Sequence, residues 1–143
     1  AGDDPCRRRP VEWLEPGYDR ILLDAPCSGL GSLRRRPESR WRRTAADVDE
    51  LVVLQKQLLT EALRLVKSGG IVVYSTCSPH PAETTAVVAD VLASVDGARQ
   101  LDARPLVTVG ELGPELLGDG PHVQLWPHIH GTDAMFLAVL TRD

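Results

Sequence analysis

The sequence predicts an α/β fold in which the strands of a parallel sheet alternate with helices. Two short apolar runs, at residues 21–24 and 71–75, each end in a loop that contains a cysteine. A stretch with apolar residues at helical spacing follows each loop, over residues 46–66 and 82–94. This alternation is typical of parallel strands joined by right-handed crossovers. The 143 residues, 43% of them hydrophobic, have the composition of one globular domain.

The first half of the chain supplies a strand, a helix and a second strand. Residues 21–24 read Ile-Leu-Leu-Asp, and this apolar run predicts a buried strand that enters a loop at Ala25. The helix predicted over residues 46–66 has one apolar face, and Ser68-Gly69-Gly70 predicts its end. Residues 71–75 are mostly β-branched, which is typical of a strand covered on both faces.

The second half begins with the helix predicted over residues 82–94. Glu83 lies in its predicted first turn, where the helix dipole favours an anion. The segment that follows is rich in Gly and Pro, and it predicts loops around a short strand at residues 106–109. Residues 135–140 predict a final strand.

Charge is distributed unevenly along the chain. The net charge of −4 is unlike that of a dedicated nucleic-acid-binding protein. A run of arginines nevertheless falls within ten residues, and such a run is either a solvated surface or a phosphate-binding surface. The run consists of Arg34, Arg35, Arg36, Arg40, Arg42 and Arg43.

Membrane, secreted and zinc-binding proteins are disfavoured by the sequence. No apolar run approaches the roughly 20 residues that span a bilayer, and the polar start lacks the apolar core of a secretory signal. We therefore expect a cytoplasmic protein that does not contact a membrane. The three cysteines lack a C-x-x-C spacing, which indicates neither a disulfide framework nor a zinc site. His128 and His130 have no third ligand nearby in the sequence, so we expect no metal.

Two cysteines directly follow the two predicted strand ends. The carboxyl ends of neighbouring strands in an open α/β sheet face one crevice. With strands about 4.8 Å apart, we expect Cys27 and Cys77 to lie within roughly 10 Å of each other. The alternative is that each is a small buried residue at the end of its strand.

The loops that carry these cysteines resemble those of one enzyme family. Residues 24–29 read Asp-Ala-Pro-Cys-Ser-Gly and residues 75–78 read Ser-Thr-Cys-Ser, a pair of motifs similar to that of the Sun (Fmu) family of RNA cytosine-5 methyltransferases. The resemblance covers nearly the whole chain, and its further matches are Gly31 to Pro37, Leu51 to Gln55, Gly69-Gly70, Glu83, Pro127-His128 and Asp133.

The resemblance implies a Rossmann-like methyltransferase fold with an antiparallel terminal strand. Residues 1–143 would then be the carboxyl-terminal part of a single catalytic domain, without the amino-terminal strands that bind the cofactor. We accordingly expect an exposed apolar strand edge, which favours self-association. We also expect the fragment to be inactive by itself.

The resemblance also implies a mechanism in which a thiolate activates the cytosine ring. Carbon 5 is a poor nucleophile until a thiolate adds to carbon 6, so the reaction requires covalent catalysis. The family pattern assigns the attack to Cys77 and release of the product to Cys27. Spacing alone leaves these two roles open, because DNA cytosine-5 methyltransferases attack with the cysteine of the Pro-Cys motif. Asp24 is expected to hydrogen-bond the polar edge of the base.

The implied cofactor is S-adenosylmethionine and the implied partner is RNA. Asp3 and Asp24 are the candidate cofactor contacts, and ribosomal RNA is favoured over transfer RNA. In this setting the arginine run is interpreted as a phosphate-binding surface. The candidate RNA-binding residues are Arg34, Arg35, Arg36 and Arg40. Trp41, within the run, either stacks on a base or anchors its loop.

Two other functions remain as alternatives at this stage. An amino-group nucleic-acid methyltransferase carries Asp/Asn-Pro-Pro followed by an aromatic residue, but that aromatic position is absent here and Cys77 would have no role. A non-catalytic RNA-binding module would keep the fold and the arginine surface while the cysteines stay idle.

Overall fold

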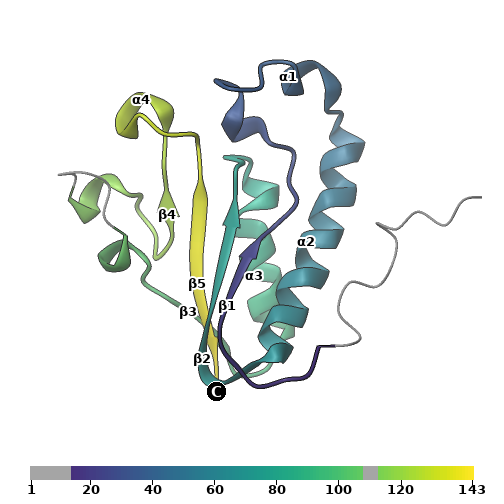
Figure 1. Ribbon diagram of the computed structural model, residues 1–143, viewed down its shortest axis with the longest axis vertical. Helices are drawn as coiled ribbons and strands as arrows, with labels where there is room; N and C mark the ends of the chain where they lie inside the picture. Colours follow the sequence, from purple (N-terminus) through teal and green to yellow (C-terminus); the bar gives the residue numbers. More distant parts are fainter. Residues whose placement is uncertain (1–13, 108–112) are drawn as a thin grey trace, which may run out of the picture.

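The structure, a computed structural model, describes residues 14–107 and 113–143 (Figure 1). The predicted cofactor contact Asp3 and the third cysteine, Cys6, lie outside the described residues. The described chain forms one five-stranded sheet with the strand order β1-β2-β5-β3, and β4 pairs with β5. The strands are β1 (Tyr18–Asp24), β2 (Val66–Thr76), β3 (Ala98–Leu101), β4 (Val123–Gln124) and β5 (Phe136–Arg142).

The directions of the strands confirm the predicted α/β class. β1 and β2 are parallel, whereas β5 is antiparallel to β2, β3 and β4. The terminal strand β5 is therefore antiparallel to every strand with which it pairs. This is the antiparallel terminal strand that the family resemblance implied.

Two long helices cover one face of the sheet, and short elements cover the other (Figure 1). Leu63 and Val87, from the two long helices, pack with Tyr74 of β2 in the larger core cluster. On the other face Leu117 and Val123 belong to a smaller cluster. The helices are α1 (Ser39–Arg42), α2 (Ala45–Leu65), α3 (Thr85–Ser94) and α4 (Pro127–His130). The 3-10 turns are η2 (Leu30–Ser32), η3 (Pro81–Glu83), η4 (Arg104–Leu106) and η5 (Pro114–Leu116). None of the described helices is long and apolar enough to cross a membrane.

Helix α2 begins at a capping box formed by Thr44 and Asp47. Thr44 Oγ1 accepts from the Asp47 N–H over 3.3 Å, and Asp47 Oδ2 accepts from the Thr44 N–H over 2.8 Å. The helix agrees with the one predicted over residues 46–66 to within a residue at each end. Its end, however, is at Leu65, and β2 starts directly afterwards. Gly69, with a φ of 73°, lies within β2 near the register shift between β1 and β2.

Two expectations about strands are wrong, and one strand was not predicted. The strand at residues 21–24 is not buried, because β1 lies at the edge of the described sheet and leaves Leu22 72% exposed. Leu106 belongs to the turn η4 rather than to a strand, and residues 108 and 109 lie outside the described residues. The strand in this region is β3, whose sequence Ala-Arg-Gln-Leu has low strand propensity and is held by pairing with β5.

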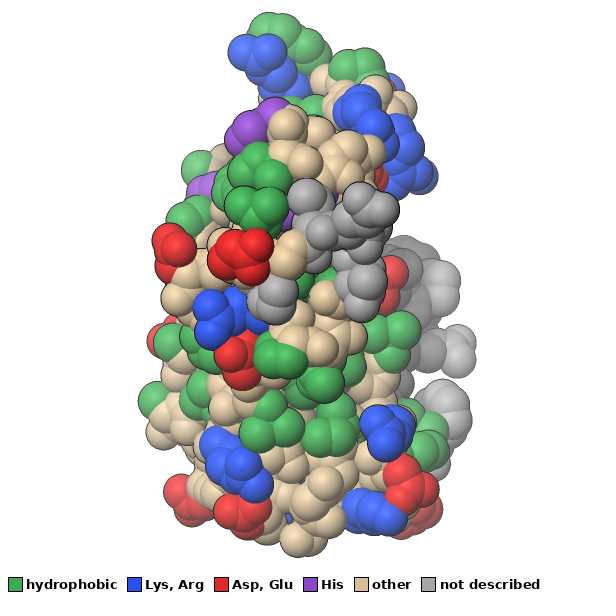
Figure 2. Space-filling model, turned by 90° about the vertical axis from the view of Figure 1, so that its left-hand side faces the viewer, with side chains coloured by type: hydrophobic (Ala, Val, Ile, Leu, Met, Phe, Trp, Pro, Cys, Tyr) green, Lys and Arg blue, Asp and Glu red, His purple; other side chains and the backbone are tan. Residues whose placement is uncertain are grey.

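The exposed edge of β1 is the feature from which self-association was expected. It is unpaired within the described residues, and self-association through it stays a prediction. Figure 2 shows Lys and Arg side chains gathered at the end of the molecule that carries α1, whereas both signs of charge are mixed at the opposite end.

Candidate active site

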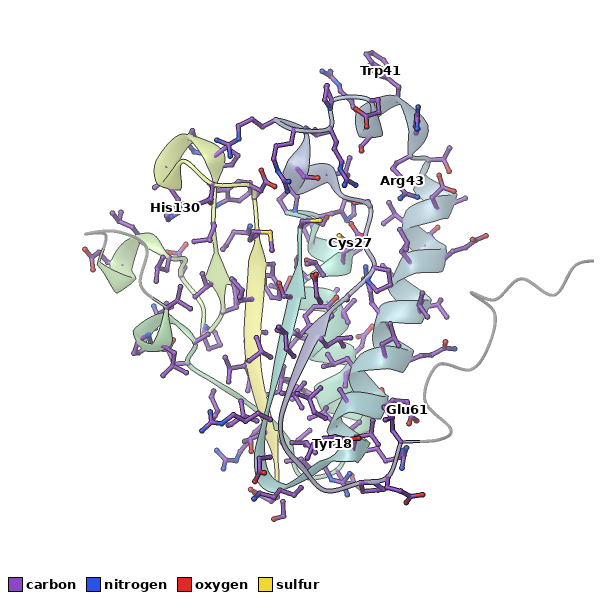
Figure 3. The ribbon with its side chains drawn as sticks, in the orientation of Figure 1. Tyr18, Cys27, Trp41, Arg43, Glu61 and His130 are labelled. Atoms are coloured by element: carbon purple, nitrogen blue, oxygen red, sulfur yellow. The ribbon has the colours of Figure 1, made fainter. Side chains whose placement is uncertain are left out.

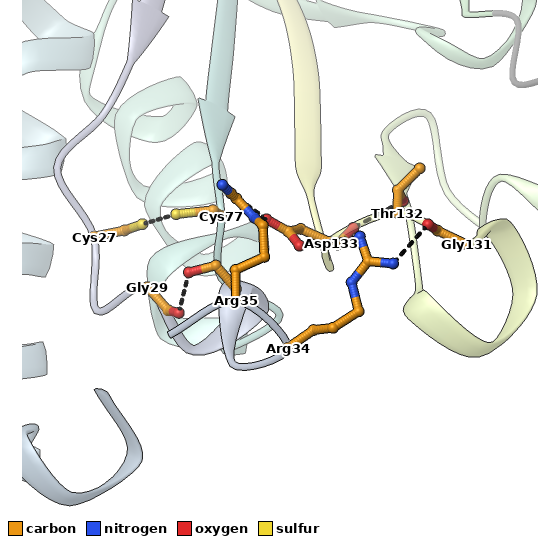
Figure 4. A network of polar contacts seen from close by, with 9 residues as sticks. Cys27, Gly29, Arg34, Arg35, Cys77, Gly131, Thr132 and Asp133 are labelled. Carbon is orange, nitrogen blue, oxygen red and sulfur yellow. Dashed lines mark hydrogen bonds and ion pairs between the residues drawn. The ribbon is translucent and has the colours of Figure 1, made fainter. Parts of the chain in front are cut away.

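The carboxyl ends of β1 and β2 bring two cysteine loops together. Asp24 pairs with Ser75 in the last position of the parallel ladder, and the Ala25 N–H donates to the Ser75 carbonyl over 2.9 Å. Just beyond, Cys27 Sγ lies 3.3 Å from Cys77 Sγ (Figure 4). The predicted approach of the two cysteines is confirmed, and one small substrate at this edge can contact both sulfurs.

The two thiols are free and half-buried. Burial, followed by the hydrogen bond and the charge of the neighbouring Cys77 sulfur, raises the pKa of the Cys27 thiol to about 12. Because the two sulfurs lie in contact, the shift belongs to the pair, and it means that the second proton of the pair is harder to remove than the first.

A largely buried carboxylate fixes the arginine-rich loop beside the thiols. Asp133, which is 9% exposed, accepts from Arg35 Nε over 2.8 Å and also from Arg35 Nη2. Arg34 Nη1 donates to the Gly131 carbonyl over 3.1 Å (Figure 4). The hydrogen bond to Asp133 is the largest of the causes that raise the pKa of Arg35, and the nearby Cys77 sulfur adds to the effect. Arg35 thus holds positive charge near Cys77.

The rest of the arginine run faces solvent. Arg36 and Arg40 are exposed, and the Arg40 guanidinium lies 5.3 Å from the centre of the Trp41 ring. Trp41 is 82% exposed, so it does not anchor the loop in the described structure. Figure 3 places Trp41 at the tip of the molecule, at the same end of the sheet as Cys27. The exposed aromatic ring and the arginines form one surface, although Arg43 instead donates through Nε to the Ser28 carbonyl over 3.3 Å.

Gly31 packs its backbone between the Cys77 loop and the residues before β5. Its N–H donates to the Cys77 carbonyl over 2.9 Å, and its carbonyl accepts from the Ala134 N–H over 2.9 Å. A Cβ atom at this position would lie 2.8 Å from the Cys77 carbonyl oxygen and would also overlap the Ala134 carbonyl oxygen. Only glycine allows so close an approach of three backbone segments.

We expect Gly31→Ala to lower the free energy of unfolding by about 1–3 kcal/mol, the usual cost of overpacking, because backbone atoms cannot move aside as side chains do. Urea unfolding measures this loss. Gly113→Ala is the matched control, since its methyl group meets only the carboxylate end of the Glu115 side chain, which is exposed and can move aside. An unchanged midpoint in Gly31→Ala would show that the three segments are not packed as described.

Comparison with known proteins assigns the chain to a family. The sequence model of the family described as 16S rRNA methyltransferase RsmB/F matches residues 5–141. The chain belongs to the RsmB/F family. This membership confirms the resemblance drawn from the two cysteine motifs.

Individual relatives agree with the RsmB/F assignment. A putative methyltransferase of Mycobacterium tuberculosis, MT1451, is 59% identical over 90% of this chain. The ribosomal RNA small subunit methyltransferase B of Pectobacterium carotovorum is 40% identical over 95% of it. The chain spans 27% and 29% of the lengths of these two relatives.

A solved structure has the same arrangement of elements as this RsmB/F chain. The crystal structure of NSun6 from Pyrococcus horikoshii with SFG superposes with a TM-score of 0.71 and 28% sequence identity. The match covers 89% of this chain and 30% of that one. The fold is therefore that of Rossmann-like methyltransferases.

The other predicted site residues of this RsmB/F chain are placed as follows. Asp24 is exposed at the end of β1, on the side of the sheet where the thiols lie. His130 Nδ1 accepts from the Trp126 N–H over 2.8 Å, within the segment that contains α4. Within residues 14–107 and 113–143 no group of three His, Cys, Asp or Glu side chains is arranged to hold a metal ion.

Sequence reasoning missed the residue that links the two cysteine loops of the RsmB/F site. Glu83 lies in η3 rather than in the first turn of a helix, and its side chain is fully buried against the serines that follow the cysteines. The helix-dipole interpretation of Glu83 is therefore wrong. The available signal was an acidic residue placed shortly after Ser-Thr-Cys-Ser, but nothing local indicates that it reaches a loop 55 residues away.

Proposed function

We propose that the protein containing this chain methylates carbon 5 of cytosine in ribosomal RNA, through a covalent adduct between Cys77 and carbon 6 of the base. The observation that carries the proposal is the 3.3 Å separation of Cys27 Sγ and Cys77 Sγ at two adjacent strand ends in an RsmB/F chain. Such a pair allows one sulfur to attack while the other assists a later step on the same ring.

The roles proposed for the two sulfurs are those that the family resemblance implies. The Cys77 thiolate adds to carbon 6, and nitrogen 3 gains a proton as carbon 5 becomes enamine-like. After carbon 5 has taken the methyl group, it loses its proton to solvent, the bond between carbon 6 and sulfur breaks, and nitrogen 3 gives up the proton that it gained. Cys27, whose sulfur lies 3.3 Å from Cys77 Sγ, assists the final elimination by hydrogen-bonding the departing Cys77 sulfur.

Asp24 is the described residue best placed to contact both the base and the cofactor. Its exposed carboxylate follows the same strand as Cys27, where ligands bind in open α/β sheets. A carboxylate there can accept a hydrogen bond from the cytosine edge and so favour protonation at nitrogen 3. S-adenosylmethionine supplies the methyl group, and the solved neighbour that carries SFG, an S-adenosylmethionine analogue, supports this choice.

RNA is the proposed substrate because positive charge and an exposed aromatic ring lie at the same end of the sheet as the thiols. Arg36 and Arg40 are free to contact phosphates, and such contacts supply affinity that does not depend on sequence. Trp41 offers a surface on which an unpaired base can stack. Arg34 and Arg35 are also held by Gly131 and Asp133, so they contribute charge in fixed positions. The names of the relatives favour ribosomal RNA over transfer RNA.

The direct test is a methylation assay on a protein of the relatives' length that contains these residues. Small-subunit ribosomal RNA is incubated with it and S-adenosylmethionine, then digested, and the nucleosides are separated by mass spectrometry. We expect 5-methylcytidine, and none when the cofactor is omitted. A methyl group on nitrogen 4 would instead support an amino-group methyltransferase. RNA binding without methylation would support a binding module.

A further inference from the structure

Behind the two thiols lies a buried carboxylate that the proposed chemistry does not use. Glu83 has no solvent exposure, and Tyr74 Oη fixes its backbone by donating to the Glu83 carbonyl over 2.8 Å. Every group hydrogen-bonded to the Glu83 carboxylate among the described residues is a neutral donor. Burying a carboxylate is costly unless donors satisfy its hydrogen bonds. The four donors therefore fix the position of the Glu83 carboxylate.

The donors come from both cysteine loops. Glu83 Oε2 accepts from Ser28 Oγ and from Ser78 Oγ, each over 2.6 Å. Ser28 directly follows Cys27 and Ser78 directly follows Cys77. A single oxygen atom therefore joins the two loops at the residues next to the reacting sulfurs.

The second carboxylate oxygen of Glu83 accepts further hydrogen bonds, one of them from the Cys27 loop. Glu83 Oε1 accepts from the Ser28 N–H over 2.7 Å and from Gln55 Nε2 over 3.2 Å. Gln55 Nε2 also donates to the Pro26 carbonyl over 2.9 Å. Helix α2 thereby takes part in the same network, and residues on both sides of Cys27 are fixed. Ser28, Ser78 and Gln55 are themselves 1% exposed or less.

We propose that Glu83 is a positioning residue that sets the separation and orientation of the Cys27 and Cys77 sulfurs. The proposal rests on the function proposed above, in which one sulfur attacks the ring and the other assists release. Glu83 does not touch the base or the cofactor, and it acts through the two serines. Its effect should therefore fall on the covalent steps and not on the binding of cofactor or RNA.

Glu83→Gln is the variant that tests this role. The amide keeps the size of the side chain but turns an NH2 group toward donors, so at least one serine loses its acceptor. We expect the single-turnover rate of adduct formation with 5-fluorocytosine RNA to fall about a hundredfold, the scale of a small misplacement of reacting groups. The Kd for S-adenosylmethionine and for RNA should change less than about threefold. A single-turnover rate constant does not depend on the fraction of molecules that are active, so partial misfolding does not imitate this result.

A second readout reports the sulfur geometry without any methylation. Dibromobimane bridges two thiols only when they lie close together, and peptide mass spectrometry identifies the Cys27–Cys77 bridge. We expect bridging to be at least about tenfold slower in Glu83→Gln. Glu61→Gln is the matched control and should bridge at the wild-type rate, because Glu61 pairs with Arg64 on the surface at the opposite end of the sheet (Figure 3).

Ser78→Ala provides the test if Glu83→Gln does not fold. It removes the donor on the Cys77 side and leaves the carboxylate with its other three hydrogen bonds. Slower bridging in either folded variant supports the positioning role, and wild-type rates in the folded variants overturn it. Absence of 5-methylcytidine from the wild-type reaction would overturn the proposed function instead, so the two failures are distinguishable.

Discussion

Replacing Cys77 with alanine in a protein of the relatives' length that contains these residues is expected to abolish the covalent adduct that the proposed mechanism forms with RNA containing 5-fluorocytosine. The fluorine on carbon 5 cannot leave as a proton does, so the reaction stops at the adduct and the adduct survives denaturing electrophoresis. Without the sulfur there is no nucleophile to add to carbon 6. We expect methylation of ordinary RNA to fall on the order of 10⁴-fold or more, as for other essential nucleophiles.

The control for this prediction is Cys27→Ala, which removes the neighbouring sulfur and leaves Cys77 in place. It should still trap the fluorinated RNA. Adduct formation by Cys77→Ala together with its loss in Cys27→Ala would reverse the two roles. Loss in both variants would mean that the two sulfurs act as a unit, contrary to the separate roles proposed here.

Cys27→Ala is expected to accumulate a covalent adduct with ordinary cytosine RNA when S-adenosylmethionine is present. Addition and methyl transfer proceed in this variant, but elimination of Cys77 lacks the thiol that lies 3.3 Å away. A positioned acid or base contributes about 10²–10⁴-fold to such a step, so turnover should fall by this factor while the adduct becomes visible on denaturing gels.

The double variant Cys27→Ala/Cys77→Ala separates this adduct from any unrelated cross-link, because it should form none. A Cys27→Ala variant that turns over at the wild-type rate, with no adduct, would remove Cys27 from product release. The short distance between the sulfurs would then reflect packing of two small side chains at neighbouring strand ends.

Topology explains why the sequence predicted the meeting of the two cysteines. Once residues 71–75 and the apolar run before Ala25 are assigned to neighbouring parallel strands, the loops that follow must share one edge of the sheet. Helix α2 was predicted from its own sequence, since its apolar residues recur at helical spacing and form one face that packs on the sheet. Both inferences start from hydrophobic patterns, and each of these patterns lies within one strand or one helix.

The features that the sequence did not predict depend on contacts between distant segments. Glu83 reaches Ser28 across 55 residues, and Arg35 reaches Asp133 across 98 residues. No periodicity or local motif encodes such a side-chain pairing. The strand β3 was missed because pairing with β5, and not its own composition, makes it extended.

The measurement that tests the central claim most directly is the location of the trapped RNA on the protein. Trypsin places the two cysteines on separate peptides, because Cys27 lies within residues 21–34 and Cys77 within residues 68–99. After digestion of the adduct with trypsin and nuclease, the account predicts the mass of the fluorinated nucleotide on residues 68–99, at Cys77. The same mass on residues 21–34 would contradict it.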